Sequence, residues 1–271
     1  MTLELLPEPW PTAFVAAIGA IFGSFLNVCI HRLPLGESVV TPRSRCPGCR
    51  TEIRWYHNVP VLSWVALRGR CATCGERISW RYPFVEALSA AAVVALWWRF
   101  GPAPAFPIAA GFVLAMIALF HTDLDHKLLP DAITLSGFVT GIAIAWFNPF
   151  LGEPGWTRVW TAVAGGALGS GLLWGIGALY KRFRGIDAMG MGDVKMMAFV
   201  GTFVGPQGVL FTLFAASVVG AVVGIVLIPL RGGSMRSELP FGCFLAPAAI
   251  AALLVGRRVI EAYYGLLVPG P

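Results

Sequence analysis

The chain has 271 residues, of which 57% are hydrophobic and only 13% are charged. Soluble domains are typically about 45–50% apolar and about 25% charged, so this composition excludes an ordinary soluble fold. The net charge is +6, but the basic residues lie mainly in loops beside apolar runs. We therefore expect membrane lipid headgroups as their partner, and no nucleic acid.

Apolar runs follow one another along the whole chain, and crossing ~30 Å of hydrocarbon takes about 17 to 25 such residues. None shows the period-2 alternation of a barrel strand, and only helices or closed barrels satisfy the backbone in lipid. The sequence therefore predicts an all-α polytopic membrane protein with about eight transmembrane helices. The expected spans lie near residues 12–30, 83–100, 105–121, 131–147, 160–180, 194–206, 208–230 and 242–263.

The distribution of Lys and Arg predicts the orientation of these spans. The loop at 31–82 carries nine arginines, and cytoplasmic loops retain an excess of basic residues. Continued through eight spans, this orientation places sixteen of the twenty Lys and Arg residues on the cytoplasmic side. Residues 1–11 hold no Lys or Arg, whereas a signal peptide begins with a basic stretch. We expect an uncleaved first helix with its N-terminus outside.

One polar stretch is long enough to form a domain of its own, and we see no internal repeat. We expect an N-terminal transmembrane helix at 1–30, a cytoplasmic zinc-binding domain at 31–82 and a membrane-embedded helical bundle at 83–271. A stretch of ~50 residues is too small to rely on a hydrophobic core, and such units usually need a metal or disulfides.

Cysteines supply the ligands for that metal. Cys46 and Cys49 form one CxxC pair, and Cys71 and Cys74 form a second pair after 21 intervening residues. Paired CxxC turns suit tetrahedral zinc, and four thiolates leave no open position, which predicts a structural role. Two disulfides are the alternative, favoured only if the loop faced an oxidising compartment. The arginine count argues against that placement.

Aspartates at the ends of spans are candidates for catalysis, because ionisable residues beside hydrocarbon are costly. Asp123 ends the third expected span, and Asp193 begins the sixth within the sequence Gly190-Met-Gly192-Asp193. Both lie on the cytoplasmic side in the expected topology, so they are able to meet. When two carboxylates share a site, one keeps a proton while the other acts as general base toward water. This pattern predicts aspartyl protease chemistry.

Other residues near these aspartates have simpler interpretations. Gly190 and Gly192 lack a Cβ, which permits a close backbone approach at the foot of the helix. Asp131 follows Pro130 and is typical of a helix N-cap or first turn. Asp125 either pairs with a neighbouring basic residue in a solvated turn or supports the active site.

These motifs, together with Gly23-Ser-Phe-Leu-Asn-Val28, occur in an order that resembles the type IV prepilin peptidases, which are intramembrane aspartyl proteases. The resemblance runs from about residue 20 to 250. It implies that Asp123 and Asp193 are the catalytic pair, and we expect Gly190, Gly192, Lys195 and Asp125 to support them.

The resemblance also implies the reaction. The substrates would be type IV prepilins or type 2 secretion pseudopilins, whose short basic leader is cut at the cytoplasmic face of the bacterial inner membrane. Family members with the zinc loop also methylate the new N-terminal amine with S-adenosylmethionine, so we expect methyltransferase activity here. The spacing of residues identifies no cofactor-binding residue for that methyl donor.

Several other functions are compatible with parts of the sequence. Presenilin-like and preflagellin peptidases share the Gly-x-Gly-Asp element, but the preflagellin enzymes lack the paired CxxC loop. A peptidase without methyltransferase activity remains an alternative. A transporter would use the aspartates for ion binding, but such residues usually lie near the bilayer midplane. A zinc-stabilised scaffold would leave the aspartate motifs without a purpose.

Overall fold

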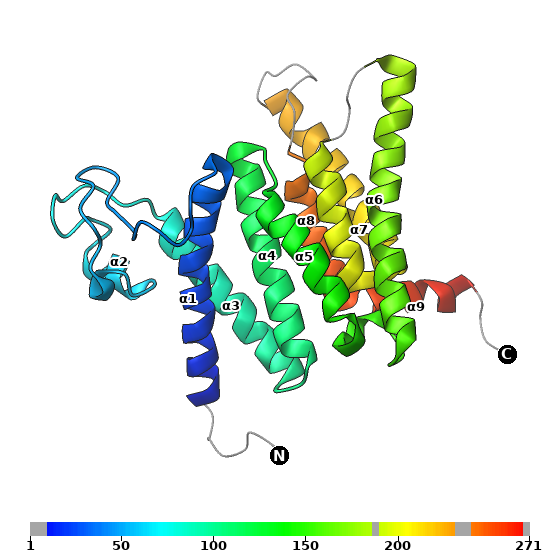
Figure 1. Ribbon diagram of the computed structural model, residues 1–271, viewed down its shortest axis with the longest axis horizontal. Helices are drawn as coiled ribbons and strands as arrows, with labels where there is room; N and C mark the ends of the chain where they lie inside the picture. The colour runs from blue at the N-terminus through cyan, green and yellow to red at the C-terminus, as the bar shows by residue number, and fades with distance from the viewer. Residues whose placement is uncertain (1–9, 186–189, 231–239, 268–271) are drawn as a thin grey trace. The chain divides into compact units, whose positions relative to one another are not determined.

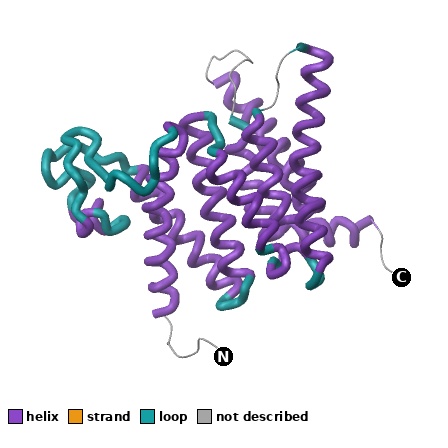
Figure 2. Tube along the Cα trace, viewed as in Figure 1, coloured by secondary structure: helices purple, strands orange, loops and turns teal. Residues whose placement is uncertain are grey.

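The computed structural model describes residues 10–185, 190–230 and 240–267, and this part of the chain is helical without a β-strand. It falls into two compact units, divided between Ala118 and Leu119. Figure 1 shows the helices coloured along the chain, and Figure 2 shows that the most extensive loop structure lies between α1 and α3. The predicted all-helical membrane class is confirmed.

Six helical segments in the described residues are long and apolar enough to cross a membrane. The eight runs expected from the sequence all form helices, but α5 (Asp131–Ala143) is short, and the sixth and seventh runs together form one element, α7. The count of six takes these two runs as one segment, although Gly205 divides α7 into two arms near the boundary between the sixth and seventh expected runs. The candidate spans are α1 (Trp10–Arg32, extended to Leu35), α3 (Arg81–Phe100), α4 (Ala105–His126), α6 (Trp156–Arg184), α7 (Met191–Leu230, apolar to Val226) and a final run, Gly242–Leu266.

The first unit packs α1 against α3 through small residues. A Cβ added to Gly19 would lie 2.8 Å from the Cα of Ala90, and one added to Gly23 would lie 2.7 Å from the Cα of Glu86. Close helix contact through small residues is the usual way for helices to associate in lipid. The connection between these helices holds short helices only: η1 (Leu33–Leu35), η2 (Trp55–His57) and α2 (Leu62–Ala66).

The second unit is organised around α7, which packs against α5, α6 and α8 (Gly242–Ala251). A Cβ at Gly165 on α6 would overlap the carbonyl group of Gly201 on α7, so both helices need small residues at this crossing. The remaining elements are η3 (Ala145–Phe147), η4 (Pro149–Leu151), a π-helical turn η5 (Ala252–Gly256) and α9 (Arg257–Leu267).

α7 is two helical arms that fold back at Gly205, whose φ of 69° and ψ of −179° are not helical. A straight helix of 40 residues would be about 60 Å long. The chain from Leu230 to Gly242 reaches about 43 Å at most. Gly192 and Gly242 nevertheless both pack against Leu129. α7 is therefore not one straight helix, and Figure 1 shows both of its ends toward the end of the unit where α6 stops, so its two arms run in opposite directions.

Asn148 stabilises this reversal. Its side-chain amide donates a hydrogen bond to the carbonyl of Phe203 (3.0 Å), and its side-chain oxygen accepts one from the N–H of Phe150 (3.0 Å). Asn148 is fully buried. Because a buried carbonyl without a partner is costly, this side chain compensates for the interrupted helix.

Candidate active site and metal centre

Asp123 lies one turn before the end of α4 and is 5% exposed. Its Oδ2 accepts a hydrogen bond from the backbone N–H of Cys243 (2.9 Å), the second residue of α8. The first N–H groups of a helix lack partners within the helix and form the positive end of its dipole. The carboxyl group of Asp123 is therefore held at the N-terminus of α8.

Gly242 makes this approach possible. A Cβ at Gly242 would lie 2.7 Å from Oδ2 of Asp123 and 3.2 Å from Cδ2 of Leu129. Leu129 is itself 7% exposed, so it has little room to move. Any larger residue at 242 would push the helix away from the carboxyl group.

Asp193 lies in the first turn of α7 and is half-buried. Its N–H donates to the carbonyl of Gly190 (3.1 Å), and a Cβ at Gly192 would lie 3.2 Å from Cβ of Leu129. Leu129 therefore packs beside both carboxylate-bearing segments. Asp123 and Asp193 thus belong to segments that both pack near Leu129, although 70 positions separate them in the sequence.

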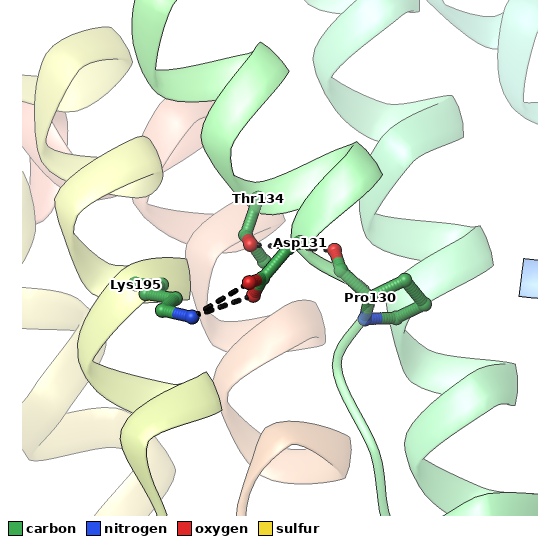
Figure 3. Close-up of polar contacts among 4 residues, drawn as sticks. All are labelled: Pro130, Asp131, Thr134 and Lys195. Carbon is green, nitrogen blue, oxygen red and sulfur yellow. Dashed lines mark hydrogen bonds and ion pairs between the residues drawn. The ribbon is translucent and has the colours of Figure 1, made fainter. Parts of the chain in front are cut away.

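Lys195 connects α7 to α5 through an ion pair. Its Nζ lies 2.8 Å from each carboxylate oxygen of Asp131 (Figure 3). Asp131 is the first residue of α5, which agrees with the predicted first-turn position. Asp125 is exposed at the end of α4, two residues after the buried Asp123.

Sequence reasoning missed three residues of this site: Leu129, Gly242 and Cys243. The sequence feature that points to Gly242 is its place at the start of the last apolar run, directly after Pro240 and Phe241. Contact with an aspartate 120 residues earlier is not visible in the sequence.

The four loop cysteines form one cluster. The sulfur atoms of Cys46, Cys49, Cys71 and Cys74 all lie within 4.8 Å of one another, and those of Cys46 and Cys74 are 3.7 Å apart. Tetrahedral zinc with Zn–S bonds of about 2.3 Å requires sulfur atoms about 3.8 Å apart. All six cysteines of the chain are free, which favours a metal over two disulfides. The donor set fits a structural zinc ion.

Both cysteine pairs are held by the same local backbone structure. The carbonyl of Cys46 accepts from the N–H of Arg50 (2.9 Å), and the carbonyl of Cys71 accepts from that of Gly75 (3.0 Å). Arg50 (φ 57°) and Gly75 (φ 74°) both adopt a left-handed conformation. An antiparallel backbone bridge between Arg45 and Glu52 encloses the first pair, and one between Arg70 and Arg77 encloses the second. The two CxxC hairpins therefore share one local structure at an offset of 25 positions.

The environment of Cys71 favours the thiolate that a metal binds. The backbone N–H groups of Cys74 and Thr73 donate to its sulfur and lower the pKa of Cys71 to about 6. Interactions with Thr51 lower the pKa of Cys49 in the same direction. Thiolates, not thiols, are the metal ligands, so the hairpin backbones favour the ligand form of Cys71 and Cys49. Burial and hydrogen bonds to the other three cysteines raise the pKa of Cys74 to about 12.

Two family models and several curated relatives match this chain. Residues 17–100 match the bacterial peptidase A24 N-terminal domain, and residues 110–225 match the type IV leader peptidase family. A Pseudomonas putida protein named prepilin leader peptidase/N-methyltransferase is 36% identical over 98% of this chain and 99% of its own length.

Two further relatives carry the same name. The Pseudomonas aeruginosa protein is 34% identical over 93% of this chain and 94% of its own length. The Myxococcus xanthus protein is 40% identical over 86% of this chain and 68% of its own length. No solved structure matches the chain at a significant level. The identity and coverage of these relatives, together with the two matching domains, establish that the chain belongs to the type IV leader peptidase family.

Proposed function

We propose that this chain removes the leader peptide of prepilins or pseudopilins with Asp123 and Asp193 as its catalytic pair, and then methylates the new N-terminus. The observation that carries the proposal is that Gly242, which meets the carboxyl group of Asp123, and Gly192, which directly precedes Asp193, both pack against Leu129. Family membership and the names of the relatives support the same activities.

The carboxyl groups titrate as a pair, because two close negative charges are unfavourable in a partly buried site. One carboxylate takes a proton from water, whose oxygen forms a bond to the scissile carbonyl carbon. The C–N bond then breaks, and the other carboxyl group gives its proton to the leaving amine. The N–H of Cys243 fixes the orientation of Asp123 during these steps. The pair of Lys195 with Asp131 positions the first turn of α7, which carries Asp193.

The cysteine cluster holds zinc in this proposal, and the sulfur spacing supports it. A closed Cys₄ site folds the loop at 31–82 and leaves cleavage to the aspartates. S-adenosylmethionine, when bound, would supply the methyl group for the new N-terminal amine, which would lose a proton, and the donor's sulfur would keep the electron pair of the broken bond. The protein's part is to bring that amine to the donor and to exclude water.

In the proposed orientation the N-terminus lies outside. The arginine-rich loop, the C-terminal end of α4 and the first turn of α7 face the cytoplasm. The positive-inside rule supports this placement. Prepilin leaders emerge at that face of the inner membrane, and anionic lipids would bind the basic loops there. Oligomeric state plays no part in the proposal.

The alternatives differ in measurable ways. A peptidase without methyltransferase activity would remove the leader and add no methyl group. A transporter would use the same aspartates to bind ions and would cut nothing. The burial of Asp123 and its hydrogen bond at a helix N-terminus do not favour a cation there, because the helix dipole is positive at that end.

The test is a mass measurement on a prepilin incubated with detergent-solubilised protein, with and without S-adenosylmethionine. Asp123→Asn and Asp193→Asn should each abolish leader removal, because an amide neither takes nor gives the required proton. Glu261→Gln makes a similar change at an exposed ion pair on α9 and serves as the control. Normal cleavage by either asparagine variant would show that the catalytic pair is wrong.

A further inference from the structure

A cavity of about 800 Å³ lies within the first unit, between α1, the cysteine loop and the start of α3. This volume is in the range of small-molecule sites, which is about 300–1,000 Å³. All of its lining residues lie at or before Glu86, so neither Asp123 nor Asp193 is among them. Cleavage as proposed above makes no use of it.

Glu86 is the notable charged group of this cavity. It lies in α3, a candidate membrane span, and is only 9% exposed. Its Oε2 accepts a hydrogen bond from the N–H of Val61 (2.7 Å), and the side chain of Ser24 also hydrogen-bonds to it. An ionisable residue within a span is costly and by default marks a functional site.

Val61 is held in an unusual conformation beside Glu86. Its φ of 60° is rare for a β-branched residue, because the left-handed region crowds the Cβ. Strained residues of this kind are concentrated at ligand sites, where the surrounding structure holds them in place. The hydrogen bond from Val61 to Glu86 supplies part of that constraint, and both residues line the cavity.

The other walls of the cavity carry aromatic and positively charged side chains. Trp64 and Tyr82 provide aromatic surface, and the indole of Trp64 is fixed by its hydrogen bond to the carbonyl of Ile78 (3.1 Å). Arg77 lines the cavity as well and provides a positive charge, as do Arg32, Arg45 and Arg54. Glu52 adds a second carboxylate, which pairs with Arg45 (3.0 Å). The site thus combines a buried carboxylate, a guanidinium group and flat aromatic faces. A ligand with an aromatic ring, a cation and a carboxylate matches all three.

We propose that this cavity binds the methyl donor S-adenosylmethionine, with the carboxylate of Glu86 holding the positively charged part of the donor. The donor carries an adenine ring for the aromatic wall, a carboxylate for Arg77, and sulfonium and ammonium cations for Glu86. A buried carboxylate attracts a cation more strongly than one in bulk water does, because the effective dielectric constant around it is lower. This inference rests on the proposed methyltransferase function.

The cysteine cluster forms part of the same cavity. Cys46 and Cys71 both line it, so a metal that fixes the two hairpins also fixes this wall. This gives the zinc loop a function in methylation without placing the metal in the reaction. Loss of the metal would remove the wall against which the donor binds.

The test measures binding of radiolabelled S-adenosylmethionine to the zinc-loaded, full-length protein by equilibrium dialysis. Glu86→Gln keeps an acceptor for Val61 but removes the charge, and it should raise the Kd roughly tenfold or more. Glu86→Asp keeps the charge and should lose less affinity. Glu37→Gln removes a charge from an exposed residue outside the cavity lining and should bind like wild type.

Photo-crosslinking of the same labelled donor to wild-type protein gives a readout that needs no variant, in case Glu86→Gln loses its zinc or unfolds. Label should appear in peptides covering residues 24–32 or 44–86. A Glu86→Gln protein with intact zinc and wild-type affinity, or label within residues 119–267, would overturn the location of the site. Absence of donor binding by the wild type would instead contradict the methyltransferase function itself.

Discussion

Lys195 on α7 and Asp131 on α5 form a two-pronged ion pair, with Nζ 2.8 Å from both carboxylate oxygens. The side chains are 32% and 56% exposed, so the pair contributes about 1 kcal/mol or less to stability. Its importance lies in its position, because Lys195 follows Asp193 by two residues. The pair fixes the first turn of α7 where a carboxyl group must be placed accurately.

Breaking this pair should therefore affect catalysis more than folding. Asp131→Asn is expected to lower kcat/KM for leader removal roughly tenfold, because small displacements of a catalytic group are costly. The thermal unfolding temperature should change little. The reversed pair, Asp131→Lys with Lys195→Asp, should recover part of the loss. A double variant that instead loses as much kcat/KM as the two single substitutions lose together would show that the contact does not act by positioning Asp193.

Gly242→Ala should strongly reduce cleavage. Its Cβ would lie 2.7 Å from Oδ2 of Asp123, so α8 or the carboxyl group must move and the bond from Cys243 is lost. We expect roughly a hundredfold lower kcat/KM. Gly171→Ala on α6, where an added Cβ meets nothing within 4 Å, is the matched control. Equal activity of both variants would argue against a close fit at Asp123.

The metal prediction is one zinc ion per chain, measured by elemental analysis of purified protein. Cys71→Ser should lose most of the zinc and make residues 43–80 sensitive to protease, because the loop lacks another core. Cys29→Ser changes a buried cysteine of α1 outside the cluster and should keep its zinc. Full zinc content in Cys71→Ser would exclude the four-cysteine site.

The reversal of α7 can be tested at Asn148. Asn148→Ala removes the donor to the carbonyl of Phe203 and leaves that carbonyl unsatisfied, which should cost about 1–3 kcal/mol of unfolding free energy. Ser136→Ala, at an exposed hydroxyl on α5, should cost far less. Denaturant titration of the two variants in the same detergent compares them directly. Equal losses would indicate that the hydrogen bond is not what holds the reversal.

The sequence by itself determined the class of protein, because a chain this apolar has few ways to satisfy its backbone outside a helical membrane fold. The paired CxxC turns determined the metal cluster, since ligand spacing is a local property that a loop preserves. Asp123 and Asp193 were also identifiable, because carboxylates at the ends of apolar runs are costly and conspicuous.

Only the tertiary structure decided what surrounds those residues. The contact of Cys243 with Asp123, the reversal of α7 at Gly205 and the burial of Glu86 in a cavity all join positions far apart in the chain. An apolar glycine or cysteine looks the same in the sequence whether it faces lipid or a carboxylate. Packing between helices decides which of these applies, and no local pattern of residues encodes it.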